Sequence, residues 1–419
     1  MAENFDSLTY LLQFLEPDRS ANKRYALVAQ VNPEQWDALI NEADRQEVAP
    51  YLYSLLVDLE ITHHLEIPHK EKLRQSCLST AAQNLRALHD AEIVFSALRV
   101  GGLPAAGLKG VYLLEHAYPD IGARSMSDID ILIHKKDLAE CIQILEGLGY
   151  CSTSYFSLDD ENTDTKHLPP MDRGGGPLVE LHWTLLEEDE PFTIDAERLW
   201  ERMMPVRIAN VDVLALGLED LILHLCLHLT YQHYLNLGLH GLMDIALVIH
   251  KFRSEIDWQK LVRIAQSWGA ERVIALTLKL VETQLNIPIP AEVFSGLMPG
   301  GIETQLLDQA RSQLLNRVRF IDPFTPDLVE MSAKNNLIAK IKIGLQRVFI
   351  PRLALARTYN IPPNSPRILG LYWTRLKYLI RKYGKTVLKL EREEAGIEPA
   401  RKKAEISKSL HEWMTQRGK

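Results

Sequence analysis

The run from Asp128 to Ile133 constrains the fold of this chain more than any other stretch. Successive side chains of a β-strand point to opposite faces, so Asp128 and Asp130 share one face while Ile129 and Ile131 share the other. The apolar run continues to Ile133, which is typical of a strand buried on both faces and argues against a solvated edge strand. Neighbouring carboxylates repel each other, and a buried strand tolerates them mainly where a hard cation needs oxygen ligands. The pattern therefore predicts a buried strand that carries a Mg²⁺ site.

A second alternating strand is predicted from Val179 to Trp183. If it lies beside the first strand, Glu180 adds a third carboxylate to Asp128 and Asp130. Three acidic side chains can hold two metal ions, and two ions suit in-line displacement at phosphorus, with one at the attacking oxygen and one at the leaving pyrophosphate. These residue types and positions indicate nucleotidyl transfer.

The residues around these strands carry a resemblance to a known family. Residues 103–150 include Leu108-Lys109-Gly110, Arg124 and Ser127-Asp128-Ile129-Asp130, and they close on Leu148-Gly149-Tyr150. This segment resembles the uncharacterised nucleotidyltransferase family of the polymerase-beta-like superfamily, and the 179–183 strand resembles the strand with that family's third carboxylate. The similarity continues through residues 215–290 and more faintly through 350–383. The resemblance implies a mostly helical α+β fold, in which a small mixed-sheet polymerase-beta-like core is flanked by N-terminal and C-terminal helical modules.

The resemblance also implies roles for individual residues. Asp128 and Asp130 would hold both metal ions, Glu180 would complete one of the two sites, and either Glu180 or Asp130 would take the proton of the acceptor. All three are thus expected as catalytic residues and as metal ligands. A further set is expected to bind the nucleotide: Lys109, Gly110, Arg124, Ser127, His228 and Asp244.

Within that set, Lys109, Gly110 and Ser127 would contact the triphosphate, and Arg124 would stabilise charge on the transferring or leaving phosphate. The wider superfamily usually has Gly-Gly or Gly-Ser shortly before the paired acids, whereas here Gly110 and Asp128 are separated by seventeen residues. Two simpler interpretations stay open, a plain strand-to-helix turn for Gly110 and a surface salt bridge for Lys109.

Four histidines, His224, His228, His233 and His240, follow in the next helical segment. His224 and His228 are four residues apart and share a helix face, the spacing of a zinc pair, but no third ligand stands at motif spacing. Three interpretations remain: a zinc site, a satisfied cluster in the core or at an interface, or side chains that face the nucleotide or acceptor. The resemblance favours the last for His228 and for Asp244, because a helical bundle after the sheet closes the cleft in superfamily members.

Composition and length describe a globular chain. It has 419 residues, of which 46% are hydrophobic, enough for a sizeable core and more than one domain. Its four cysteines lack C-x-x-C spacing, so neither a disulfide framework nor a zinc ribbon is indicated. No leader pattern and no run of about 18 apolar residues is present, so no transmembrane segment is expected and a cytoplasmic location is predicted.

Charge is divided along the chain. The net charge is −8, yet after residue 333 basic residues outnumber acidic ones by 20 to 6, whereas before it acidic residues outnumber basic ones by 49 to 27. The basic segment could pack on the acidic body, bind RNA or lie on an anionic membrane. We expect packing on the body, with apolar contacts from Leu371, Trp373, Leu376 and Leu379, and a polar, fraying end after residue 391.

The element pattern predicts four parts: an N-terminal helical module (1–100), an α/β nucleotidyltransferase core (101–212), a helical domain that closes the cleft (213–333) and a basic helical segment (334–419). The first part includes a long helical run with predicted apolar contacts at Leu85, Leu88, Ile93, Phe95 and Leu98. Inside the core, residues 157–177 read as an acidic loop whose glycine run, Gly174-Gly175-Gly176, forms a hairpin turn.

The favoured function is a Mg²⁺-dependent nucleotidyltransferase. It would use two ions, take an NTP, with ATP as the expected nucleotide, and transfer a nucleoside monophosphate to a hydroxyl or similar group of an unidentified small molecule, peptide or protein. Nucleic acid is a less favoured partner. Two alternatives remain: a catalytically silent protein that kept the fold as a scaffold, and an RNA- or membrane-associated protein that acts through its basic tail.

Overall fold

The computed structural model describes residues 5–153, 166–187, 190–316, 348–391 and 398–416, apart from positions 351, 353–354, 356–357 and 363. Part of the predicted acidic loop, up to residue 165, and residues 334–347 of the predicted basic segment lie outside the described residues. The fold is α+β and mostly helical, with one mixed sheet, as predicted. The boundaries of the four parts, 1–100, 101–212, 213–333 and 334–419, remain a prediction.

Seven strands form the sheet, in the order β3-β4-β5-β2-β1-β7-β6. They are β1 (Ala105–Gly107), β2 (Asp128–Ile133), β3 (Cys151–Ser152), β4 (Met171–Asp172), β5 (Leu178–His182), β6 (Met204–Ile208) and β7 (Val211–Ala215). β2 lies between β5, to which it is parallel, and β1, to which it is antiparallel. The predicted buried strand is confirmed, because Ile129, Ile131 and Ile133 are all fully buried.

The predicted turn at Gly174–Gly176 joins β4 to the antiparallel β5. Gly174 and Gly175 both have positive φ, a conformation that costs residues with a Cβ atom but not glycine. The glycine run is therefore a hairpin turn, as predicted.

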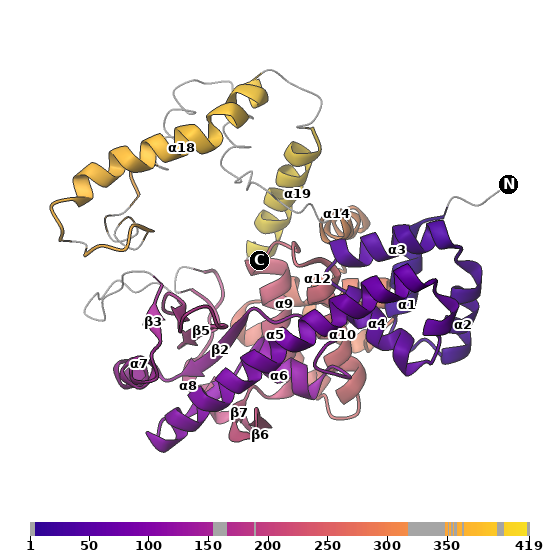
Figure 1. Ribbon diagram of the computed structural model, residues 1–419, viewed down its shortest axis with the longest axis horizontal. Helices are drawn as coiled ribbons and strands as arrows, with labels where there is room; N and C mark the ends of the chain where they lie inside the picture. Colours follow the sequence, from indigo (N-terminus) through magenta and orange to yellow (C-terminus); the bar gives the residue numbers. More distant parts are fainter. Residues whose placement is uncertain are drawn as a thin grey trace.

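Helices precede the sheet: α1 (Ser7–Leu15), α2 (Ala21–Gln30), α3 (Pro33–Arg45), α4 (Ala49–Asp58) and α5 (Ile67–Val100). α3 starts with a capping box, in which Asn32 and Gln35 each accept a hydrogen bond from the other's backbone N–H. The long α5 contacts α3 and α4 as well as β1, β2 and β7, and so joins these helices to the sheet (Figure 1). Its Phe95 and Leu98 are buried as predicted, but Leu85 is 56% exposed, so its predicted core contact is wrong.

Helices α6 (Lys109–His116), α7 (Leu138–Gly147) and α8 (Ala196–Glu201) lie between the strands along the chain. After β7 the chain is helical again, with α9 (Leu218–Cys226), α10 (Gly238–Phe252), α11 (Trp258–Trp268), α12 (Glu271–Leu285), α13 (Ala291–Leu297) and α14 (Thr304–Leu315). α9 continues directly into a π-helical turn, Leu227–Gln232. Turns of this type are rare and frequently mark functional sites.

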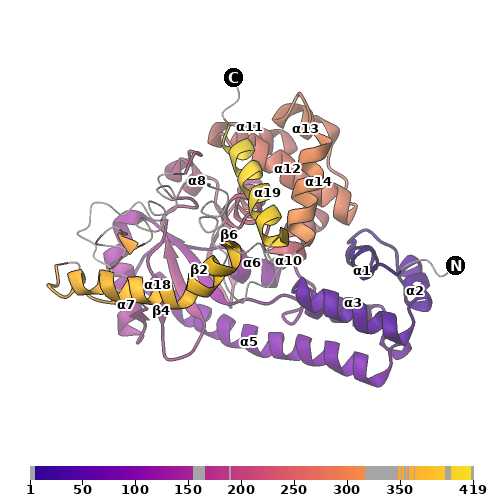
Figure 2. The same cartoon turned by 90° about the horizontal axis from the view of Figure 1, so that it is seen from above.

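The C-terminal segment contains α18 (Ile368–Glu391) and α19 (Glu398–Thr415), which behave differently. α19 packs on α14 and α12, where Leu410 and Met414 are buried and Arg272 contacts Trp413 through a hydrogen bond of 3.2 Å to its carbonyl oxygen (Figure 2). The predicted fraying end is therefore wrong for residues 398–415, and docking on the body is confirmed for this helix. Trp373 of α18 is 60% exposed, so its predicted contact with the body is wrong.

None of the helices in the described parts of the chain combines the length and the apolar character that a membrane span requires.

We expect the docked face of α19 to contribute to stability. Leu410 is 3% exposed against α14 and α12, so Leu410→Ala should lower the free energy of unfolding by about 2 to 5 kcal/mol, the usual range for a leucine removed from a core. Lys408→Ala, on the exposed side of the same helix, should stay within about 0.5 kcal/mol of the wild type. Urea unfolding measures both, and equal stability of the two variants would show that α19 is not docked in solution.

Candidate active site

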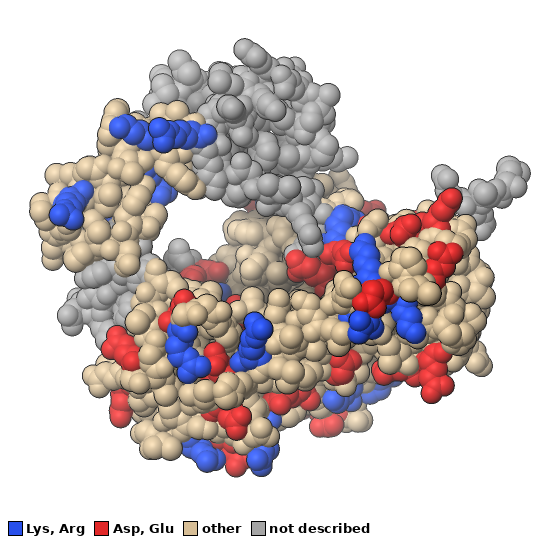
Figure 3. Space-filling view, in the orientation of Figure 1, with Lys and Arg blue, Asp and Glu red and all other residues tan. Residues whose placement is uncertain are grey.

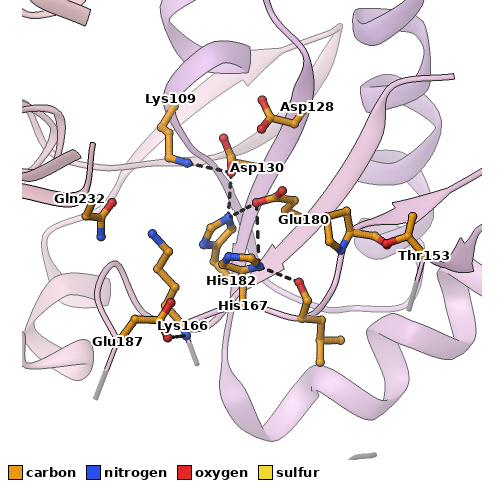
Figure 4. Close-up of polar contacts among 12 residues, drawn as sticks. Lys109, Asp128, Asp130, Thr153, Lys166, His167, Glu180, His182, Glu187 and Gln232 are labelled. Carbon is orange, nitrogen blue, oxygen red and sulfur yellow. Dashed lines mark hydrogen bonds and ion pairs between the residues drawn. The ribbon is translucent and has the colours of Figure 1, made fainter. Parts of the chain in front are cut away.

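The parallel register of β2 and β5 brings two acidic side chains together. Asp130 pairs directly with Glu180 across the two strands (Figure 4). Asp130 is 3% exposed, and Glu180 is partly exposed at the edge of the same site. The prediction that the two strands are neighbours is therefore confirmed.

Two cationic or hydrogen-bonding groups converge on Asp130. Lys109 Nζ donates a hydrogen bond of 2.9 Å to Asp130 Oδ1, and His182 Nε2 lies 2.8 Å from the same oxygen. A carboxylate can only accept, so His182 carries a proton on Nε2. Burial alone would raise the pKa of Asp130, but Lys109 and His182 outweigh it and hold that pKa well below its usual range. Asp130 is therefore ionised.

His182 also links Asp130 to Glu180. Its Nε2 lies 3.5 Å from Glu180 Oε2, and His167 Nδ1 lies 3.9 Å from the same oxygen. Burial is the largest single influence and raises the pKa of Glu180, but the contacts with His182 and His167 together outweigh it and leave the pKa lowered. Asp130, Glu180 and His182 each offer one possible ligand atom, all within 4.8 Å of one another.

His182 was missed as a site residue, although the sequence contained its signal. Glu180 and His182 are two residues apart on a strand, so the alternation that identified Glu180 also places His182 on the same face. His182 completes a group of possible ligands with Asp130 and Glu180, and the metal role of Asp128 stays a prediction.

Asp128 stands next to this group on the same face of β2 (Figure 4). Its Oδ1 accepts a hydrogen bond of 3.2 Å from Ser127 Oγ. Burial raises the pKa of Asp128, and the neighbouring charges of Asp130 and Glu180 raise it further against the opposing effect of Lys109. The three acids thus share one electrostatic environment.

Lys109 and Gly110 form the junction between β1 and α6. Lys109 has a φ of 42°, in the left-handed region that non-glycine residues rarely adopt, and its side chain is only 12% exposed. The alternative of a surface salt bridge is therefore wrong, since the lysine is fixed on buried Asp130. A Cβ atom at Gly110 would lie 2.9 Å from the Met126 side chain, so a larger residue at this position would force Met126 to shift.

Arg124 and Asp244 bind each other rather than facing the acids. Arg124 donates from Nε to Oδ1 at 2.8 Å and from Nη2 to Oδ2 at 2.9 Å, and Tyr118 Oη donates to the same Oδ1 at 2.7 Å. Arg124 Nη1 donates to the carbonyl oxygen of Ser125 at 3.1 Å. Both charged side chains are buried. Arg124 and Asp244 thus form a buried bidentate ion pair that joins the loop before β2 to α10, and their contact with nucleotide stays a prediction.

The fourth histidine, His240, belongs to the surroundings of this pair. Its pKa is lowered first by burial, and the charges of Asp244 and Arg124 act on it in opposite directions. His224 lies on α9, His228 lies on the π-helical turn and His233 directly follows that turn, and the ring centroids of His228 and His233 are 4.4 Å apart. Among the described residues, the histidines do not form a group of three converging metal ligands, so the zinc interpretation gains no support.

Lys166, His224, His228 and His233 form a nitrogen-rich wall beside the acids. After burial, the largest influence on the pKa of each of these groups is the charge of Lys109, which lowers it. His233 reaches a pKa of about 4, and the pKa values of His224 and His228 lie well below the usual histidine value. The three imidazoles are therefore neutral.

Lys166 extends into the space between His182 and Gln232 (Figure 4). Its backbone N–H donates to Glu187 Oε2 at 2.7 Å, which holds the segment in place. Its amino group makes no ion pair with a described residue. Lys166 was missed because it follows an acidic stretch with no motif around it, and only the folded chain brings it to the site.

A chain of hydrogen bonds orients His228. Gln232 Nε2 donates to the carbonyl oxygen of Leu185 at 3.0 Å, so Gln232 Oε1 must accept from His228 Nδ1, which lies 3.1 Å away. The proton of the neutral ring is then on Nδ1, and Nε2 carries a lone pair. Leu185 follows β5 closely, so this chain ties the π-helical turn to the strand that carries Glu180.

The comparison with known protein families decides the assignment. The model of a family described as uncharacterised nucleotidyltransferases matches residues 32–286, more than half of the chain. The chain belongs to this nucleotidyltransferase family. The match covers the acids of β2 and β5, the nitrogen-rich wall and α3 to α5 of the N-terminal region. Neither the curated proteins nor the solved structures contain a match to this nucleotidyltransferase.

The Arg124–Asp244 pair of the nucleotidyltransferase should be a structural requirement. Asp244→Asn leaves the buried guanidinium without its counter-charge, so the free energy of unfolding should fall by about 3 to 5 kcal/mol. The double variant Arg124→Met/Asp244→Leu should recover much of this loss, because it removes both buried charges. Asp212→Asn, at an exposed carboxylate of β7, is the matched control. A stable Asp244→Asn protein that had lost only its affinity for NTP would show that Asp244 binds nucleotide and is not required for stability.

Proposed function

We propose that this nucleotidyltransferase uses Mg²⁺ to transfer a nucleoside monophosphate from an NTP, with ATP as the expected donor, to a hydroxyl or similar group of its acceptor, with release of pyrophosphate. The observation that carries the proposal is the parallel register of β2 and β5, which sets Asp130 opposite Glu180 with Asp128 beside them. Family membership supports the transfer of a nucleotide, and the acid cluster supports the metal dependence.

The donor atoms fit Mg²⁺. Asp130 and Glu180 present carboxylate oxygens, the ligand type that hard divalent cations prefer, and Asp128 stands beside them as a third. We assign His182 to positioning, because its protonated Nε2 lies close to both carboxylates and cannot coordinate while it holds that proton. When bound, two Mg²⁺ ions would lower the pKa of the acceptor oxygen and stabilise negative charge on the leaving pyrophosphate.

The balance of the reaction assigns a proton to the acid cluster. The acceptor oxygen forms a bond to the α-phosphorus as the bond between that phosphorus and the bridging oxygen breaks, and pyrophosphate leaves with the bridging oxygen. The proton of the acceptor passes to a carboxylate. Glu180 is better placed for this than Asp130, because its side chain is 18% exposed whereas Asp130 is 3% exposed and already accepts two contacts.

The nitrogen-rich wall supplies the complementary half of the site. Lys109 and Lys166 carry positive charge beside the acids, which suits the triphosphate of the donor. His228 presents a lone pair on Nε2, which suits a hydroxyl of the nucleotide sugar or of the acceptor. We therefore keep Lys109 and His228 as substrate-binding residues and add Lys166. Ser127 and Gly110 remain proposed neighbours of the triphosphate. Arg124 and Asp244 are proposed to position the loop before β2 through their buried ion pair.

The metal dependence is tested with the paired acids of β2. Asp128→Asn/Asp130→Asn should weaken binding of ATP in the presence of Mg²⁺ by more than about tenfold, because each charged contact that is lost contributes about 1.5 to 3 kcal/mol. The effect should vanish when EDTA replaces Mg²⁺. Titration calorimetry measures both conditions, with Asp212→Asn as the control for an exposed aspartate of the same sheet. Equal Mg-ATP affinity in the double variant and the wild type would rule out the proposed metal site.

Lys166 gives a cleaner test of the phosphate-binding wall than Lys109, which also neutralises buried Asp130. Lys166→Ala should weaken Mg-ATP binding by about 1 to 3 kcal/mol and leave the melting temperature nearly unchanged, because its amino group serves no described ion pair. Lys408→Ala, on α19, controls for the loss of one positive charge. An unchanged affinity for Mg-ATP together with an intact metal requirement would remove Lys166 from the site.

A further inference from the structure

Helix α18 packs by one face on a small cluster of its own. Its Ile368 is fully buried with Leu355, and Leu371 and Tyr372 pack against them. Tyr372 Oη donates a hydrogen bond of 3.0 Å to the carbonyl oxygen of Ile350. This cluster is separate from the main core, and a gap separates α18 from the body in the space-filling view (Figure 3). The side of α18 next to this packed face is exposed at Leu369, Trp373 and Ile380.

That outer face carries an apolar stripe. Leu369 is 74% exposed, Trp373 is 60% exposed and Ile380 is 61% exposed. Their spacings of four and seven residues place them on one side of the helix, one above the other. Phe349, 61% exposed, adds a further ring beside Tyr372, with ring centroids 5.5 Å apart. Few soluble surfaces leave such large apolar side chains in a continuous row without a partner.

A basic row runs alongside the stripe. Lys377 and Arg381 are exposed and four residues apart, and Lys377 Nζ lies 5.5 Å from the centroid of the Trp373 ring. Basic side chains of α18 are visible on its outer side in Figure 3. The sequence of the helix contains six Lys+Arg and a single acid, Glu391, at its last position. The helix thus combines a strong positive charge with an exposed apolar edge.

We propose that α18 binds an anionic membrane surface, with Leu369, Trp373 and Ile380 in the headgroup and acyl boundary and Lys377 and Arg381 on the lipid phosphates. Tryptophan prefers this boundary because its ring is apolar and its N–H is polar, and aliphatic side chains gain free energy there by leaving water. Basic side chains near an anionic surface add electrostatic attraction that salt screens. The helix lies on the membrane and does not span it.

The composition of the stripe favours a membrane over RNA. Single-stranded RNA is held by basic groups and by aromatic rings on which bases stack. Leu369 and Ile380 offer no ring, so RNA would leave their exposed surface uncompensated. A lipid boundary covers aliphatic and aromatic side chains alike.

The test is co-sedimentation of the full chain with vesicles of phosphatidylcholine, with and without phosphatidylglycerol. The wild type should sediment with the anionic vesicles only, and less in high salt. Leu369→Asp/Ile380→Asp and Lys377→Glu/Arg381→Glu should each weaken this binding by more than about tenfold. Leu85→Asp on α5 and the pair Lys23→Glu/Lys70→Glu are matched controls at exposed positions far along the chain, and they should bind like the wild type.

Tryptophan fluorescence gives a second readout. Trp373 should shift to shorter wavelength on anionic vesicles, and Trp373→Phe should still sediment but lose the shift. Three results would overturn the proposal. The wild type could fail to sediment with anionic vesicles. A labelled single-stranded RNA could bind instead, with loss of binding in the charge variant and not in the aliphatic variant. Leu369→Asp could lower the melting temperature, which would show that the stripe packs on the body in solution.

Discussion

The pairing of β2 with β5 is the interaction on which the site depends. A shift of this register by one residue would turn every side chain of one strand to the other face, so that Glu180 would no longer meet Asp130. The buried isoleucines of β2 prevent the shift, because they would lose their place in the core. The cost of burying Asp130 is offset locally by Lys109 and His182, which neutralise the carboxylate without moving it. The packing of the buried isoleucines and the pairing of Asp130 with Glu180 therefore favour the same register of β2 and β5.

A second buried charge pair holds the helical wall in relation to these strands. Arg124 stands a few residues before β2, and Asp244 belongs to α10, which packs on α9. Their bidentate contact holds the loop before β2 against α10, and α10 packs on α9, whose π-helical turn carries His228 and Gln232. A pair of this kind contributes orientation more than net stability, since both ions give up hydration. Two ion pairs thus position the site. Lys109–Asp130 lies among the acids, and Arg124–Asp244 joins the loop before β2 to α10.

Local patterns were enough to predict β2, β5 and the facing acids, because alternation and burial depend on neighbouring residues only. The same alternation places His182 on the face of Glu180, but the predicted metal set contained carboxylates alone. Contacts between distant segments were not accessible in this way. Arg124 and Asp244 were each predicted to bind nucleotide, and no local pattern indicates that residues 120 positions apart neutralise each other. Lys166 was missed for the same reason.

Charge alone does not explain why α19 packs on the body and α18 does not. The apolar faces of the two helices account for the difference. Both belong to the basic segment, and charge alone predicts that both pack on the acidic body. α19 buries Leu410 and Met414 against α12 and α14, and apolar burial of this kind persists in salt. α18 uses Ile368 and Leu371 on a separate cluster and leaves a second apolar row in solvent. The proposed membrane contact would cover this second row at a boundary that is both apolar and anionic, which matches its aliphatic side chains and the lysine and arginine beside them.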